Sequence, residues 1–217
     1  MKPRGRPRSF DRDEALRRAM ELFWVKGFEN TSMADLTSAM GLNPPSVYAA
    51  FGSKEQLFRE ALDLYVRTEG SGIWDAIEAA PTAREAIARL LRATAVAYTR
   101  GPQPRGCMIV LAAPQMEGAN PAICDDLREH RLENVAIIER RLERAVAEGE
   151  LPAGIDCAGI AAYFACVQHG MSIQARDGAS RDTLLAIAAC AMAGWERLVP
   201  NPGQPPPGPS ERPPGAR

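Results

Sequence analysis

GLNPPSVYAAFGSKEQLF, residues 41–58, contains a short helical pattern that begins behind two prolines and stops at Gly52. A helix of barely two turns is not stable alone in water, because nucleation is costly and few hydrogen bonds follow it. Neighbouring elements must therefore hold it in place. Proline is tolerated in the first helical turn, where N–H groups have no internal partner. We place Pro45 at the first helical position and Pro44 near the N-cap.

Helical patterns flank this stretch on both sides. The first predicted helix has Asp11 as its N-cap and Glu14 as the partner in a capping box, and it ends at Gly27. The second runs from Thr31 or Ser32 to residue 40, and a fourth starts at residue 53. Helices two and three, joined by a turn at residue 41, form a helix-turn-helix.

The third helix has an inner and an outer side in this arrangement. Val47 and Phe51 face inward, whereas the outer side is left to face a groove in DNA. The outward residues are Asn43, Ser46, Tyr48 and Ala49. Small residues permit close approach but offer few long side chains for reading bases. Shape and phosphate contacts should therefore matter more than usual.

The rest of the chain is also helical in pattern, and no segment alternates as a strand does. The apolar face of the long helix includes Leu132 and Val135. We expect helices at 73–79, 82–98, 121–148, 156–175 and 181–198, with a short apolar segment at 107–113. Residues 200–217, PNPGQPPPGPSERPPGAR, should be a disordered tail because they cannot bury enough apolar surface. The fold class is all-α.

Charge is unevenly distributed along the 217 residues, although the formal net charge is only -1. Residues 1–68 carry 11 Lys/Arg against 9 Asp/Glu, and the first eight, MKPRGRPR, hold four cations and no acid. Such an arm on a nearly neutral body favours a local polyanion contact, with nucleic acid as the leading candidate.

The cysteines and histidines exclude other classes of protein. The five cysteines form no C-x-x-C pair and sit in apolar stretches, which indicates reduced thiols. His130 and His169 are the only histidines and lack metal or triad spacing, so we expect no enzyme, cofactor or metal site. No apolar run is long enough for a bilayer and no signal peptide is evident, so we expect a soluble cytoplasmic protein without a membrane partner.

The stretch TSMADLTSAMGLNPPSVYAAFGSKEQLF, residues 31–58, resembles the DNA-binding domain of the TetR family of bacterial transcriptional regulators. An aromatic pair, a break and a Ser-Lys-Glu-x-Leu sequence carry the resemblance, which extends over residues 10–65. These places are filled by Tyr48, Phe51, Ser53, Lys54, Glu55 and Leu57. The chain departs from the family at Thr37, usually Ala, and at Pro44-Pro45, where a cation and a Gly are common. The second departure removes a phosphate contact and makes the arm more important.

The resemblance implies that one set of residues touches DNA: Thr31 or Ser32, Asn43, Ser46, Tyr48 and Lys54. Hydroxyls and free N–H groups at a helix start suit a phosphate. Plain alternatives stay open. Tyr48 could pack against the first helix, Lys54 could be a solvated charge, and the hydroxyls could only cap. Arg4 and Arg6, in an RGRPR segment similar to AT-hook peptides, would enter an A·T minor groove, unless the arm is merely solvated.

The same resemblance divides the chain into a basic disordered arm at 1–9, a helix-turn-helix domain at 10–56, an effector-binding and dimerisation domain at 57–199 and the tail. It implies a homodimer formed through the last two helices, which are rich in small residues and could alternatively form an intrachain core. The candidates for an effector pocket, each of which could instead be ordinary core, are Trp74, Leu91, Tyr98, Cys107, Met108, Leu111, Met116, Val135 and His169.

Cys107 is also a candidate redox switch. It follows Arg105 and Gly106 at an expected helix start, where a cation and the helix dipole lower a thiol pKa; the alternative is a small buried residue. The resulting hypothesis is a homodimeric repressor that leaves a palindromic operator when an unknown small molecule binds or the thiol is modified. The alternative hypothesis is a constitutive architectural DNA-binding protein without an effector.

Overall fold

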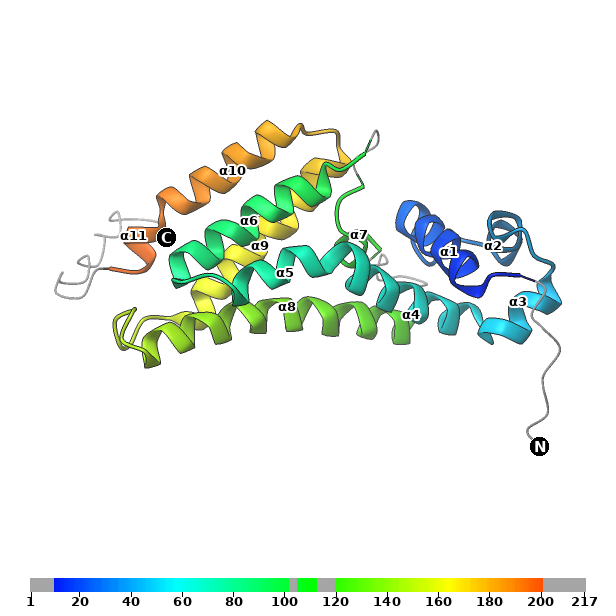
Figure 1. The fold of residues 1–217 in the computed structure, drawn as a ribbon, viewed down its shortest axis with the longest axis horizontal. Coiled ribbons are helices and arrows are strands. Elements are labelled where there is room, and N and C mark those ends of the chain that lie inside the picture. Colours follow the sequence, from blue (N-terminus) through cyan, green and yellow to red (C-terminus); the bar gives the residue numbers. More distant parts are fainter. Residues whose placement is uncertain (1–9, 102–104, 113–119, 201–217) are drawn as a thin grey trace, which may run out of the picture.

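The computed structural model describes residues 10–101, 105–112 and 120–200, and these residues contain helices and no strand. Figure 1 shows a small group of helices at one end and a larger bundle at the other. The small group is α1 (Arg12–Lys26), α2 (Met33–Met40) and α3 (Pro44–Phe51), and α4 (Lys54–Tyr65) leads from it into the bundle. The predicted all-α class and the helix-turn-helix are therefore confirmed.

The bundle holds the remaining helices. These are the π-helical turn η1 (Val66–Gly70), α5 (Ser71–Glu78), α6 (Ala83–Tyr98), α7 (Met108–Leu111), α8 (Pro121–Ala147), α9 (Cys157–Arg176), α10 (Arg181–Ala193) and α11 (Trp195–Leu198). The long helix α8 runs beside α4 and α5, whereas α10 lies on the outside of the bundle (Figure 1). One apolar core continues from α1 to α11. Its aromatic centre in the small group is Phe23, Phe28 and Phe58, with ring centroids 5.0–6.2 Å apart.

Several local predictions are wrong for identifiable reasons. Glu14 does not close a capping box, since its carboxylate bonds Arg17 and Arg18. The helix predicted at 73–79 begins earlier, because η1 joins α4 directly to α5, which starts at Ser71. Leu132 is 60% exposed instead of facing the core. The buried stripe of α8 includes the polar residue Asn134 instead, four residues before Ile138 and on the same face of the helix.

Neither end of the chain is fully described by the structure. The basic arm at 1–9 and nearly all of the Pro-rich tail lie outside the described residues. Cys166 and Cys190 are exposed, so the prediction that all five cysteines sit in apolar surroundings is wrong for these two. Among the described helices, none combines the length and apolar character needed to cross a membrane. Nor do the described residues bring three potential metal ligands together.

Candidate nucleic-acid interface and effector cavity

Helix α3 presents one side to the outside. Val47 and Phe51 are buried, whereas Tyr48 is 51% exposed. Packing of Tyr48 against α1 is therefore not observed. Asn43 is the N-cap, its Oδ1 accepts a 2.9 Å hydrogen bond from the Ser46 N–H, and Pro44 occupies the first helical position. The predicted register, with Pro45 first, is wrong by one residue because the Asn43 side chain decides where the helix starts.

Arg12 fixes the orientation of α3. One guanidinium nitrogen donates to both carboxylate oxygens of Glu60, at 2.7 and 2.6 Å, and also to the Ala50 carbonyl at 3.3 Å. The same guanidinium lies 4.4 Å from the centroid of the Phe51 ring. One side chain of α1 therefore joins the C-terminal end of α3 to α4. This explains how a helix of eight residues, too short to be stable alone, is held in place.

The two adjacent hydroxyls before α2 have different roles. Ser32 is exposed and forms a reciprocal capping box with Asp35. Thr31 has no exposed surface, and its hydroxyl donates a 2.6 Å hydrogen bond to the Gly27 carbonyl. Thr31 therefore stabilises the turn between α1 and α2 and cannot reach DNA in this conformation. Of the two residues only Ser32 is exposed, and its contact with DNA stays a prediction.

Lys54 begins α4, and its Nζ lies 4.2 Å from the centroid of the Phe28 ring. Partial burial lowers the pKa of this ammonium below its ordinary value, an effect that the charges of Glu29 and Glu55 oppose. The side chain is only half-buried. Lys54 is thus a positioned cation at a helix start, where the dipole also favours an anion.

The other cations of residues 10–65 are paired with carboxylates. These ion pairs join Arg12 to Glu60, Arg17 to Glu14 and Glu21, Arg18 to Glu14, Lys26 to Asp35 and Arg59 to Asp126. Hydrogen bonds from the two arginines hold the pKa of Glu14 at about 2. Hydrogen bonds from the Ser32 N–H and then Lys26 hold the pKa of Asp35 at about 2. Within this described part of the chain, Lys54 alone has a cation without a carboxylate ion pair.

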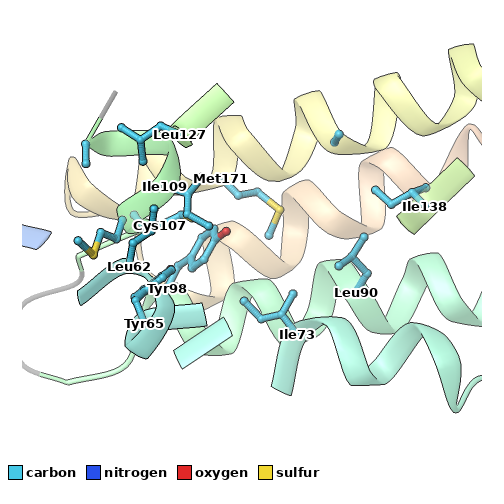
Figure 2. Packing of buried hydrophobic residues seen from close by; sticks show 14 of the residues in the cluster. Leu62, Tyr65, Ile73, Leu90, Tyr98, Cys107, Ile109, Leu127, Ile138 and Met171 are labelled. Carbon is cyan, nitrogen blue, oxygen red and sulfur yellow. The ribbon is translucent and has the colours of Figure 1, made fainter. Parts of the chain in front are cut away.

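A cavity of about 370 Å³ lies between α4, α5, α6 and α8, within the range typical of small-molecule sites. Three predicted pocket residues line it: Trp74, Tyr98 and Cys107. Figure 2 shows Cys107 beside Tyr65 and Tyr98, near the side chain of Leu62. Burial, and then the neighbouring Cys107, raises the pKa of both tyrosines well above the ordinary value. Both hydroxyls therefore stay protonated near neutral pH.

The remaining pocket predictions have other outcomes. Met116 lies outside the described residues, as do Arg4 and Arg6 of the arm. Leu91 and Met108 are fully buried core. Leu91, Met108, Leu111, Val135 and His169 are not among the residues that line the cavity. His169 packs elsewhere on α9, where burial and then Arg131 lower its pKa. Sequence reasoning missed two lining residues, Tyr65 and Asn134. An aromatic residue on the inner face of a helix, such as Tyr65, is assigned to the core. A polar residue such as Asn134 is not expected within an apolar stripe.

Residues 105–107 connect the cavity to the DNA-binding helices. The Trp24 indole N–H on α1 donates a 3.2 Å hydrogen bond to the Gly106 carbonyl, and the Trp24 ring packs edge-on against Tyr65 at 4.9 Å. On the other side, the Cys107 N–H donates a 2.7 Å hydrogen bond to the Ser172 hydroxyl on α9. Cys107, which lines the cavity, is therefore the next residue after Gly106, whose carbonyl is hydrogen-bonded to α1.

Helices α9 and α10 leave an apolar surface uncovered. Tyr163 and Ile173 on α9 are 42% and 50% exposed, unusual for large apolar side chains. Small residues surround them: Ala158, Gly159, Ala162, Cys166, Gly170, Ala186, Ala189, Cys190 and Ala193 are exposed. Part of each helix still packs inward, α9 through Phe164 and α10 through Leu184. The two helices thus contribute to the intrachain core and present a second face to the outside.

Comparison with known proteins covers both parts of the fold. A family model described as "Bacterial regulatory proteins, tetR family" matches residues 15–61, and one described as "Tetracyclin repressor-like, C-terminal domain" matches residues 81–192. The HTH-type transcriptional repressor ComR of Escherichia coli (strain K12) is 36% identical over 199 residues, which cover 91% of this chain and 95% of ComR. The repressor BdcR of the same organism is 33% identical, covering 86% and 90%.

A solved structure is similar over nearly the same length. It is a cysteine mutant of the TetR family transcriptional regulator CifR complexed with 26-base-pair double-strand operator DNA. The two chains share 46% sequence identity and superpose with a TM-score of 0.84, covering 88% of this chain and 100% of the other.

Proposed function

The chain belongs to the TetR family of DNA-binding transcriptional repressors, which are regulators and not enzymes, and from this premise we propose a homodimer that leaves a palindromic operator when its cavity is occupied or Cys107 is modified. The observation that carries the proposal is the hydrogen-bonded connection from Cys107 through Gly106 to Trp24. It gives the cavity a physical route to the recognition helices.

The DNA-binding surface comprises the outer side of α3 and the starts of α2 and α4. Ser32, Asn43, Ser46, Tyr48 and Lys54 are the proposed contacts. Ser32 and Asn43 use side-chain oxygens for capping, so their contacts to phosphate come from their remaining polar atoms. Because the other cations of this domain are paired, Arg4 and Arg6 of the arm supply much of the free positive charge. CifR binds operator DNA, which supports the same use of this fold here.

Dimerisation through α9 and α10 explains their uncovered apolar face. A twofold axis would place the same two helices of each copy in contact and form a four-helix interface. Tyr163 and Ile173 would fill its gaps, and the small residues would allow close approach. Two recognition helices would then meet successive major grooves about 34–36 Å apart.

Release follows from a change at the 105–107 segment. An adduct on Cys107, or an occupant large enough to press on its thiol, would displace Cys107 from its place beside Tyr65 and Tyr98 (Figure 2). Displacing Cys107 pulls on Gly106, and therefore on Trp24 of α1. A rotation of α1 carries α3 with it, since Arg12 joins them. Even a small rotation spoils the spacing of two recognition helices.

The testing experiment has two stages. Selection of bound duplexes from a random pool should return a palindrome with half-sites one helical turn apart. The selected operator is then titrated with wild-type protein and with Cys107→Ser, each with and without mild peroxide. Peroxide oxidises the thiol to a sulfenic acid and is reduced to water, so wild type should lose affinity and Cys107→Ser should keep it.

Cys124→Ser serves as the control variant, because Cys124 lies on α8 outside the cavity lining. It should respond to peroxide like wild type. A pool without a palindrome would contradict the dimeric mode of binding. If mass spectrometry finds Cys107 unmodified while operator binding persists, the thiol is not the switch. A thermal-shift screen that finds no stabilising small molecule would then favour the architectural alternative.

A further inference from the structure

Asn134 is the polar group of the cavity that the packing does not explain. Its side chain is 9% exposed and lines the cavity from α8. No hydrogen bond to its amide is found among the described residues. The amide faces the cavity space, so its donors and its acceptor are available to an occupant. A ligand that accepts from, or donates to, this amide would give it a partner.

A nucleophile lines the same cavity. Cys107 is 5% exposed, and the hydroxyls of Tyr65 and Tyr98 lie beside it. The rest of the interior is apolar, with Ile73, Trp74, Ile109 and Ile137 in the lining. A molecule that enters must give up most of its hydration, and in return it finds the Asn134 amide, the two tyrosine hydroxyls and half-buried Ser71 and His130. Burial of an ion under these conditions is strongly unfavourable.

The mouth of the cavity carries mainly negative charge. Asp75 and Glu133 are exposed lining residues, against one exposed cation, Arg67. A groove of about 490 Å³ shares His130 and Glu133 with the cavity and continues from it between α4 and α8. The groove adds three carboxylates and one arginine: Asp63, Asp126, Glu129 and Arg59. Two of the carboxylates are paired with arginines, Asp126 with Arg59 at 2.7 Å and Glu133 with Arg140 at 2.6 Å. Asp63, Asp75 and Glu129 form no ion pair among the described residues and outnumber Arg67, so an approaching anion meets a net unfavourable potential.

We propose that the cavity selects a small uncharged molecule with a carbonyl-type hydrogen-bonding group, which the Asn134 amide binds next to the Cys107 thiol, and that the acidic mouth excludes the corresponding anions. This inference deepens the proposed function and rests on it, because it names the class of effector for the same cavity. Asn134 acts as the specificity-determining residue, and Glu133 acts on approach.

Iodoacetamide and iodoacetate form a matched pair of probes. Both are attacked by the cysteine thiolate at carbon, a C–S bond forms, the C–I bond breaks, iodide leaves and the thiol proton passes to the buffer. They differ only in one group, which is an uncharged amide in iodoacetamide and a carboxylate in iodoacetate. The alkylation rates of Cys107 are measured by mass spectrometry in the folded full-length protein. The same cysteine in the urea-unfolded chain gives the intrinsic ratio of the two rates, and half-buried Cys124 is the internal control.

The iodoacetamide-to-iodoacetate ratio at folded Cys107 should exceed the unfolded ratio by about tenfold or more, since field and desolvation act together. Asn134→Leu should slow alkylation by iodoacetamide several-fold at Cys107 and not at Cys124, because it removes the amide that would hold the reagent beside the thiol. Glu133→Gln should accelerate iodoacetate selectively. If Asn134→Leu does not fold, the iodoacetamide-to-iodoacetate ratios of the wild-type protein and of Glu133→Gln still test whether the cavity excludes anions.

Equal ratios in the folded and unfolded protein would overturn the inference, as would a folded Cys107 that neither reagent reaches while Cys124 reacts. An unchanged Cys107 rate in folded Asn134→Leu would remove Asn134 from the role. Operator binding measured on the same samples separates this inference from the proposed function. Alkylated protein that keeps its operator would contradict release while leaving the selectivity intact. If both reagents release the operator, and the ratio of their rates equals that of the unfolded chain, the proposed function is supported and the selectivity is contradicted.

Discussion

Replacing Gly106 by Ala should be among the most damaging single-methyl changes in this protein. Gly106 has a φ of +65°, a region that L side chains rarely adopt. A Cβ built at this position would lie 2.8 Å from both the Leu111 Cδ1 and the Ser172 Oγ, and closer still to the Ser172 carbonyl oxygen. The methyl group thus has unfavourable backbone geometry and no space between residues 105–107 and α9.

The magnitude follows from two contributions that a control variant separates. Left-handed backbone costs about 1–2 kcal/mol for a residue with a Cβ. Overpacking against a backbone oxygen adds about 1–3 kcal/mol, so Gly106→Ala should lower the free energy of unfolding by about 2–5 kcal/mol in total. Gly149 has a φ of +76° and no neighbouring atom within 4 Å of a built Cβ. Gly149→Ala should therefore cost only the first contribution.

Equilibrium urea unfolding measures both variants, at one protomer concentration and with the cysteines kept reduced, because association and thiol chemistry change apparent stability. The difference between the two losses isolates the packing of Gly106 against Ser172. A loss for Gly106→Ala no larger than that for Gly149→Ala would refute the description of residues 105–107 as tightly packed. Release through this segment would then lose its structural basis.

Thr31→Val removes a buried hydroxyl and should lower stability by about 1 kcal/mol without changing the operator affinity of the folded protein. Ser32→Ala should reduce both stability and affinity. Urea unfolding and operator titration by fluorescence anisotropy distinguish the two variants, and equal losses of affinity would contradict the assignment. Deleting residues 2–8 removes four cations and should lower the slope of log affinity against log salt by about 3–4; an unchanged slope would exclude the arm from the interface. The pKa values of Glu14 and Asp35, each about 2, lie below the ordinary values of 4.5 and 3.8. Their stabilising contribution is therefore present above about pH 4.5 and is lost as the pH falls toward 2. The double variant Glu14→Gln, Asp35→Asn should flatten the pH dependence of stability over that window, and a dependence equal to that of wild type would contradict the assignment.

Much of the fold could be predicted because the signals are local. Asp11, Ser32, Ser53 and Thr82 each cap a helix through a side chain three or fewer residues from the N–H it accepts, and the sequence shows them directly. Two prolines in succession both satisfy the requirements of the first turn. Their register could therefore not be chosen without knowing that the Asn43 side chain caps the helix.

The cavity was harder to predict because its residues come from α4, η1, α5, α6, α7 and α8 and include polar groups. Trp74, Tyr98 and Cys107 stood out as large or reactive residues among apolar ones. Asn134 gives no such signal, since a polar residue in an amphipathic helix is ordinarily assigned to the solvent face. Its burial depends on the packing of α8 against α5 and on the cavity itself, neither of which helical periodicity encodes.

The arrangement around Gly106 also determines how a signal could travel. The carbonyl group of Gly106 is bonded to Trp24, and the next N–H, that of Cys107, is bonded to Ser172. With the Cα of Gly106 packed against α9 as well, the segment has no room for a gradual shift. A displaced Cys107 must break one of these hydrogen bonds or carry α1 along with it. Packed segments of this kind change between discrete arrangements instead of deforming continuously. An occupant that only fits the cavity would then have no effect on the operator, whereas one that displaces Cys107 would switch it fully.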